Sequence, residues 1–140
     1  GVSNFKPADI DNILGSSRVA PMVNQVLAHV TNTPTELIEY SRDNGMVVEA
    51  YSPIGHGELF KNAQLADIAS RNGVSVPQLA IRYTLQLGLL PLPKTSNTDH
   101  MRSNAEVDFE ISDEDMDVLV NMEQIEDYGD ASFFPVYSGV

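Results

Sequence analysis

The feature that most constrains the fold is the alternation of strand-like and helix-like segments along the chain. Apolar runs typical of buried strands occur at 19–26, 46–51 and 89–93. Between them, apolar residues recur at helical spacing. Strands and helices in alternation predict βαβ units. We therefore expect an α/β protein with parallel strands joined by right-handed crossover helices.

Capping sequences mark where the helices begin. In Thr33-Pro34-Thr35-Glu36 and Ser75-Val76-Pro77-Gln78, a Thr or Ser precedes a Pro and is followed three residues later by Glu or Gln. This pattern predicts a capping box with the hydroxyl residue as N-cap. Helices are expected to begin near Pro7, after Thr33, after the loop 54–57, after Ser75, at Thr98 and after Ser112.

The number of strands limits the size of the sheet. Three strands follow Gly1–Phe5, a segment typical of the last residues of a fourth strand. A complete (β/α)₈ barrel has eight strands and about 250 residues. The 140 residues therefore predict one unit over 1–140, about half a barrel ending in a loop. The first residue is not methionine, and we expect earlier sequence to be missing.

Composition excludes several classes of function. The chain has 20 acidic and 8 basic residues and a formal charge of −12, whereas nucleic-acid and anionic-membrane surfaces need clustered positive charge. It has no cysteine, so it can form neither a disulfide nor a thiolate metal site. It also has no apolar run near the roughly 20 residues that span a bilayer. A cytoplasmic protein that binds neither nucleic acid nor membrane is expected.

Four ordered segments resemble the carboxyl-terminal half of the aldo-keto reductase barrel, and are closest to bacterial reductases of the diketogluconate type. The resemblance runs from Gly1 to about Leu119. The segments are Gly1-Val2-Ser3-Asn4-Phe5, Val23-Asn24-Gln25-Val26, Ala50-Tyr51-Ser52-Pro53-Ile54-Gly55, and Leu92-Pro93-Lys94-Thr95-Ser96 followed by Ser103-Asn104.

The resemblance implies a cradle for a nicotinamide cofactor at the carboxyl ends of the strands, where barrels of this type bind ligands. Ser3, Asn4 and Gln25 offer a hydroxyl and two amides, which can satisfy the C=O and NH₂ of the carboxamide. The matching family residues do this. Polar residues at strand ends can also simply cap the backbone, but two such segments together favour the cofactor.

Tyr51 matches the family residue whose ring stacks on the nicotinamide. A lone aromatic residue would more often belong to a core. The turn that follows, Ser52, Pro53 and Ile54, matches the family segment that runs along the pyrophosphate. In the same loop, His56 has an open role, and a surface histidine is the simpler interpretation.

Lys94, Thr95 and Ser96 precede a helix start, where free N–H groups and the helix dipole attract anions. The resemblance implies that this element holds the adenosine 2′-phosphate of NADPH, with Asn104 near the adenine. Where NADP-preferring relatives carry an arginine, this chain has His100. Histidine has fewer donors and is mostly neutral at pH 7. We therefore expect weaker phosphate selectivity and use of NADH alongside NADPH.

Two features remain, a histidine and the end of the chain. His29 is interpreted as structural, without an identifiable partner. The end of the chain, from Tyr128 to Val140, is expected to be a loop packed on the body or over a pocket. Its aromatic residues Phe133 and Phe134 are candidates for one wall of a substrate pocket.

In the family, carbonyl reduction needs a tyrosine acid with a lysine, an aspartate and a histidine, and all four precede the part that this chain resembles. We assign no catalytic residue and no metal ligand. Three hypotheses stay open. The chain is part of an NAD(P)H-dependent reductase of small carbonyl compounds, or a non-catalytic half-barrel that binds nucleotide or self-associates through its strand edges, or an unrelated α/β module.

Overall fold

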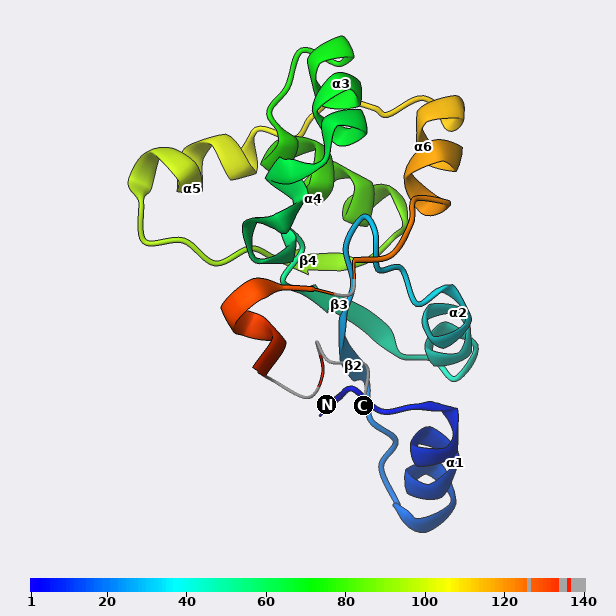
Figure 1. Cartoon of the computed structure of the whole chain (residues 1–140). Helices are drawn as coiled ribbons and strands as arrows, with labels where there is room; N and C mark the ends of the chain where they lie inside the picture. Colours follow the sequence, from blue (N-terminus) through cyan, green and yellow to red (C-terminus); the bar gives the residue numbers. More distant parts are fainter. Residues whose placement is uncertain (126, 134–135, 137–140) are drawn as a thin grey trace.

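The structure, a computed structural model, describes residues 1–125, 127–133 and 136 (Figure 1). The strands are β1 (Val2–Ser3), β2 (Val23–Leu27), β3 (Val47–Tyr51) and β4 (Leu90–Leu92). The helices are α1 (Pro7–Ser16), α2 (Thr35–Asp43), α3 (Ala63–Arg71), α4 (Val76–Gln86), α5 (Thr98–Ala105) and α6 (Asp113–Val120), with 3₁₀ segments η1 (Gly55–Lys61) and η2 (Gly129–Phe133).

The four strands form one sheet in the order β1-β2-β3-β4, and every neighbouring pair is parallel. A strand order that follows the chain is the order of a (β/α) barrel, whereas a doubly wound sheet reverses direction at a switch point. The prediction of an α/β fold with parallel strands and crossover helices is confirmed. β1 and β4 form the two edges.

The two faces of the sheet differ. Side chains alternate along a strand, so Val26, Val48 and Ala50 point to the helix face, where they form a buried cluster with Ile38 of α2. The register aligns the other set, which we call the open face: Ser3, Val23, Gln25, Leu27, Val47, Glu49, Tyr51, Leu90 and Leu92. Much of the open face is uncovered, with Val47 47% and Leu90 50% exposed.

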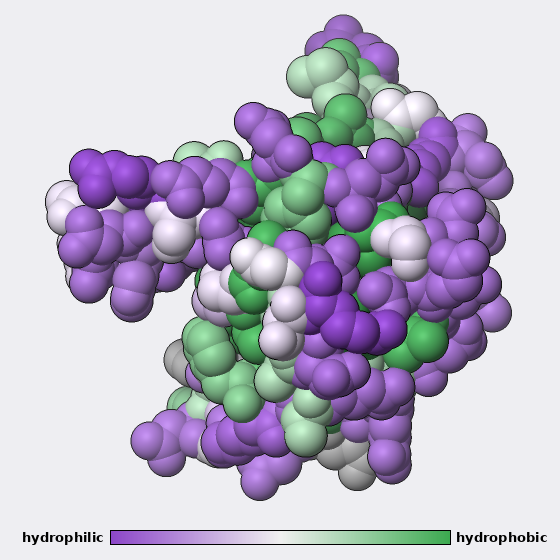
Figure 2. All heavy atoms as spheres, turned by 90° about the horizontal axis from the view of Figure 1, so that it is seen from above, coloured by the Kyte–Doolittle hydropathy of each residue, from purple (hydrophilic) through white to green (hydrophobic). Residues whose placement is uncertain are grey.

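A second buried cluster lies among the helices that follow β3. It joins Leu59, Leu65, Leu79, Tyr83 and Leu119 from η1, α3, α4 and α6. Polar side chains dominate the surrounding surface (Figure 2), as expected for a chain with 20 acidic residues. Through Leu59, this cluster anchors η1, the segment that follows the turn after β3.

One capping box is confirmed and the other is wrong. Ser75 Oγ accepts a hydrogen bond from the Gln78 N–H, and the Gln78 side chain accepts from the Ser75 N–H. Thr33 does not cap α2, whose N-cap position is Pro34. The Thr33 hydroxyl instead donates to the His29 carbonyl and hydrogen-bonds the hydroxyl of the buried Tyr83 at 2.7 Å. A long-range partner therefore replaces the local cap.

The strand predicted at 19–26 is wrong in its first part, because β2 begins only at Val23. Val19 and Met22 are 79% and 73% exposed. The register with β3 begins at the pair of Val23 and Val47, and the Met22 carbonyl accepts from the Val47 N–H at 2.8 Å, so the sheet contact starts at the last residue of the 19–22 stretch. The proline-containing strand β4 lies at a sheet edge, where proline is tolerated.

The described part of the carboxyl-terminal segment is partly helical. Tyr128 is buried and packs on Leu27 of the open face, and η2 follows it, so the expectation of a plain loop is corrected. Phe133 is 87% exposed, and the predicted role of Phe134 lies outside the described residues. In the described residues, no helix has the length and apolar character needed to cross a bilayer.

Candidate functional site

The structure brings Ser3, Asn4, Gln25 and Tyr51 together at the carboxyl edge of the sheet. Ser3 is in register with Gln25, and the Ser3 hydroxyl and Asn4 N–H both donate to the Gln25 carbonyl, at 3.1 and 2.9 Å. The Tyr51 hydroxyl donates to Asn4 Oδ1 at 3.1 Å. Asn4 has a φ of 56°, a left-handed conformation that asparagine adopts more readily than most residues.

The hydrogen bonds at this edge fix the orientation of two amides. Asn4 Oδ1 accepts from Tyr51, so the amide nitrogen of Asn4 is the atom left to donate. Gln25 Nε2 donates to Glu49 Oε2 at 2.9 Å, so Gln25 Oε1 is left to accept. The edge therefore offers one donor and one acceptor from neighbouring strands. A planar carboxamide group needs this complementary pair.

The neighbouring Asn24 belongs to the same sequence motif but has a different role. It lies on the helix face, fully buried, and its amide nitrogen donates to the Phe5 carbonyl at 3.0 Å and to Ser41 Oγ at 3.3 Å. It fixes the turn after β1 against α2. Of the two amides in Val23-Asn24-Gln25-Val26, only Gln25 faces the open side.

The turn after β3 lines a pocket of about 390 Å³. Its walls include Ser52, Pro53 and Ile54 from this turn and Leu92, Pro93 and Lys94 after β4. Exposed His56 also lines it and hydrogen-bonds Ser52 Oγ at 3.1 Å. The turn is tight, because Ser52 and His56 have φ values of 51° and 52°. The structure thus brings the turn beside the segment that holds Lys94.

A second pocket of about 400 Å³ continues from the first, because Ile54 and Lys94 line both. It contains three more predicted residues, Thr95, His100 and Asn104. Figure 1 shows α5, which carries His100 and Asn104, projecting from the body, and Figure 2 shows a hollow beside this projection. Ser96 is exposed and lies outside both pockets.

The start of α5 is less free to bind an anion than the sequence predicts. Asn97 Oδ1 accepts hydrogen bonds from the Asp99 and His100 N–H groups, at 2.8 and 3.3 Å. These are two of the N–H groups that a helix start otherwise offers. Arg102 lies 3.6 Å from the Asp99 carboxylate and does not line the second pocket. Lys94 is therefore the cation that this pocket presents among the described residues.

Sequence reasoning missed several residues at the sheet edge and around the second pocket. Glu49 holds the Gln25 amide, and its position two residues before Tyr51 on the same strand could have placed it on the same face. Phe60, Ser75 and Pro77 line the second pocket. They come from η1 and the start of α4, and no local signal in the sequence links them to Lys94.

His29 has the partner that the sequence did not identify. It is fully buried, its Nδ1 donates to the Val30 carbonyl, and its Nε2 accepts from the Tyr128 hydroxyl at 3.0 Å. The Tyr128 hydroxyl in turn accepts from Asn32 Nδ2 at 3.0 Å. Burial lowers the pKa of His29 below its ordinary value; the hydrogen bond to Val30 opposes this shift and nearby His56 adds to it. The structural interpretation of His29 fits this network.

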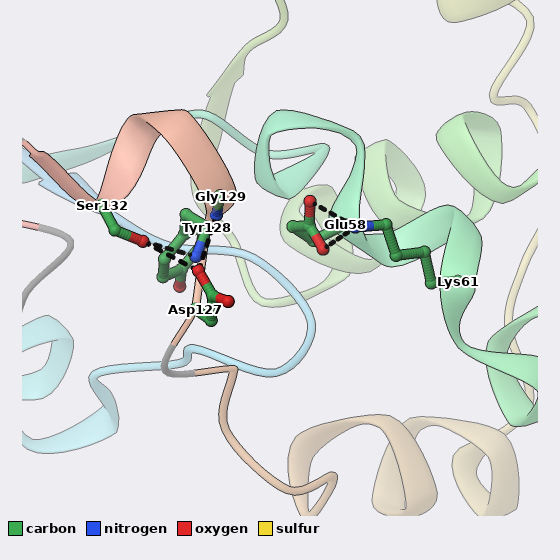
Figure 3. Close-up of polar contacts among 6 residues, drawn as sticks. All are labelled: Glu58, Lys61, Asp127, Tyr128, Gly129 and Ser132. Carbon is green, nitrogen blue, oxygen red and sulfur yellow. Dashed lines mark hydrogen bonds and ion pairs between the residues drawn. The ribbon is translucent and has the colours of Figure 1, made fainter.

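The segment that carries Tyr128 is held by its own polar contacts (Figure 3). Asp127 Oδ1 accepts from the Gly129 N–H at 2.8 Å and from the Ser132 hydroxyl at 3.2 Å, and Ser132 Oγ accepts from the Tyr128 N–H. The nearby Glu58–Lys61 pair belongs to η1. In the described part of the chain, no group of three or more acidic or histidine side chains could hold a metal ion.

Comparison with known proteins gives a consistent result. The model of the aldo/keto reductase family matches residues 1–124. An uncharacterized oxidoreductase of Schizosaccharomyces pombe is 43% identical over 130 residues, which cover 91% of this chain and 46% of that protein. The glyoxal reductase of Bacillus subtilis is 39% identical over 120 residues, covering 85% and 44%.

Solved structures agree with the fold. An aldo-keto reductase from a Medee basin deep-sea metagenome library superposes with a TM-score of 0.84 at 31% identity, covering 88% of this chain and 47% of that one. An aldo-keto reductase complexed with NADPH gives a TM-score of 0.81 at 30% identity, covering 89% and 42%. The chain spans less than half the length of these relatives, and its four strands match about half of their TIM barrels.

Proposed function

Because the chain belongs to the aldo/keto reductase family, we propose that it forms the cofactor-binding part of an oxidoreductase that reduces aldehydes or ketones to alcohols with NAD(P)H. The observation that carries the proposal is the donor and acceptor pair of Asn4 and Gln25, held by Tyr51 and Glu49. The NADPH complex of one similar structure and the carbonyl substrate in the name of the glyoxal reductase support it.

In this proposal, the residues would follow a nicotinamide dinucleotide from its nicotinamide end to its adenosine end. Asn4 would donate to the carboxamide oxygen and Gln25 would accept from its NH₂, while the Tyr51 ring would cover one face of the nicotinamide. The bound cofactor would supply a hydride to the carbonyl carbon. The first pocket, beside Ser52, Pro53 and Ile54, would take the pyrophosphate.

The adenosine end would occupy the second pocket, with Lys94, Thr95 and His100 near the 2′-phosphate and Asn104 near the adenine. Ser96 would contribute only from the exposed rim. His100 is exposed and offers at most two donors, against five in arginine. We therefore propose NADPH as the main cofactor with measurable use of NADH. A small carbonyl compound is the proposed substrate, and the proton donor for it is not assigned to this chain.

Fluorescence titration with NADPH tests the proposal. Replacement Lys94→Ala removes a charge-assisted contact to the phosphate, which should raise the Kd at least about tenfold. Lys61→Ala is the matched control, because Lys61 pairs with Glu58 and lines neither of the two pockets. Equal effects of the two replacements, or absence of binding to the unmodified chain, would refute the cofactor role.

The open face favours a second arrangement. Parallel sheets are normally covered on both faces, whereas here Val47 and Leu90 are exposed and β1 and β4 are free edges. Two copies could cover these surfaces by pairing their edges. Sedimentation velocity at several concentrations tests this arrangement: a dimer is expected, and a monomer throughout would exclude it.

A further inference from the structure

Glu49 occupies a particular place on the open face. It lies in the middle of β3, between Gln25 of β2 and Leu90 of β4 in the register. Its side chain is partly buried, and its carboxylate accepts the hydrogen bond from Gln25 Nε2 at 2.9 Å. No lysine or arginine pairs with Glu49 in the described residues. Among the described residues, the hydrogen bond from Gln25 is therefore the polar contact of the Glu49 carboxylate.

A carboxylate can impose one orientation on an amide. The oxygen and the nitrogen of a glutamine amide have nearly the same shape, so packing alone does not decide which of them points in which direction. An ionised carboxylate only accepts hydrogen bonds, so it must face the amide nitrogen. Glu49 therefore turns Gln25 Nε2 toward itself and Oε1 away. Without Glu49, the amide could present its NH₂ to a ligand as readily as its oxygen.

We propose that Glu49 is a positioning residue that makes Gln25 an acceptor for the NH₂ of the nicotinamide carboxamide. This inference rests on the proposed cofactor role. Glu49 would not touch the carboxamide in this scheme, because it acts through Gln25. We therefore expect the site to prefer ligands whose nicotinamide-like ring carries a substituent with hydrogen-bond donors.

The experiment compares two ligands that differ at this substituent. In the acetylpyridine analogue of NADP⁺, a methyl group replaces the carboxamide NH₂, so the bond to Gln25 Oε1 is lost. Calorimetric titration of the full chain should show a preference for NADP⁺ of about tenfold, the value of one well-placed hydrogen bond. In Glu49→Leu the preference should fall below about threefold. In Glu49→Gln the preference should lie between these two values, because the new amide can present either its oxygen to Gln25 Nε2 or its nitrogen to Gln25 Oε1.

Adenosine 2′,5′-bisphosphate separates the failure of this inference from the failure of the proposed function. It lacks the nicotinamide, so its Kd should be the same for the unmodified chain and all variants. If the unmodified chain does not bind it, the cofactor role is wrong and the inference falls with it. If it binds but Glu49→Leu keeps the tenfold preference, only the role of Glu49 is overturned.

If Glu49→Leu does not fold, a second variant can be used for the same test. Glu49→Val has no polar side-chain atom and a β-branched side chain that suits a strand. The same comparison of ligands can therefore be made with it. A preference unchanged in Glu49→Val, with bisphosphate binding intact, would contradict the role of Glu49.

Discussion

Replacing Tyr128 with Phe should strongly destabilise the fold, because the Tyr128 hydroxyl joins two separate parts of the chain. It donates to Nε2 of His29, next to β2, and accepts from Nδ2 of Asn32, both at 3.0 Å. The replacement keeps the ring, which packs on Leu27 and lies edge-on to the His29 ring at 5.7 Å between centroids. It therefore removes the two hydrogen bonds and preserves most of the packing.

The magnitude follows from the burial of the two partners. A buried polar atom left without a partner costs about 1–3 kcal/mol. His29 is fully buried and should incur the full cost, whereas Asn32 is half-buried and should incur the lower end. We expect Tyr128→Phe to lower the free energy of unfolding by about 2–4 kcal/mol, a large part of the stability of a typical domain.

Urea unfolding followed by circular dichroism measures this change. Tyr83→Phe is the control: Tyr83 is also buried, but its hydroxyl has one hydrogen bond, to Thr33 Oγ1, and Thr33 keeps its bond to the His29 carbonyl. That replacement should cost only about 1 kcal/mol. If Tyr128→Phe cost no more than Tyr83→Phe, the reasoning about the His29 network would be refuted.

Three further predictions concern stability. Folding lowers the pKa of His29, so its contribution to the free energy of unfolding is complete above pH 6.5 and is lost as the pH falls. The loss is up to about 1.4 kcal/mol per pH unit. Urea unfolding at pH 7.5 and 5.5 should show this drop in the free energy of unfolding, and His29→Gln should make the drop smaller. Ser75→Ala should cost about 1 kcal/mol in the same assay, since it removes a confirmed N-cap, and no loss would contradict that role. Gly88→Ala should lower the Tm, because φ is 72° and the new Cβ would lie 2.9 Å from Arg42 Nη2. An unchanged Tm would contradict the backbone strain expected at this position, since movement of Arg42 relieves only the contact.

Local signals in the sequence predicted the fold well where the interactions themselves are local. The Ser75 cap depends on atoms three residues apart, and the structure confirms it. The Thr33 pattern is almost identical, yet its hydroxyl bonds Tyr83, fifty positions away. The apolar run at 19–22 also resembles a strand, but the register with β3 begins only at Val23, and Met22 meets β3 through a single backbone hydrogen bond from Val47. Patterns of residue type cannot distinguish these cases, because the deciding partner is distant in sequence.

The candidate site was predictable to the extent that strand ends converge in a parallel sheet. This rule, together with the family resemblance, led to Asn4, Gln25 and Tyr51, which hydrogen bonds connect directly or through the backbone. It could not identify Phe60, which reaches the second pocket from η1. It also overestimated the free N–H groups of α5, because the Asn97 side chain caps two of them.

The hydrogen bonds that hold Asn4 and Gln25 also affect how fast and how tightly a ligand can bind. Immobilising a flexible side chain on binding costs about 0.5–1.5 kcal/mol of conformational entropy. Here Tyr51 and Glu49 restrict both amides before any ligand binds. The conformational entropy of these side chains is therefore lost when the chain folds and not when a ligand binds. The carboxamide of the proposed cofactor would meet an edge whose donor and acceptor are already oriented. The carboxyl edge of the sheet is thus a preorganised surface, and its selectivity is determined when the strands pair.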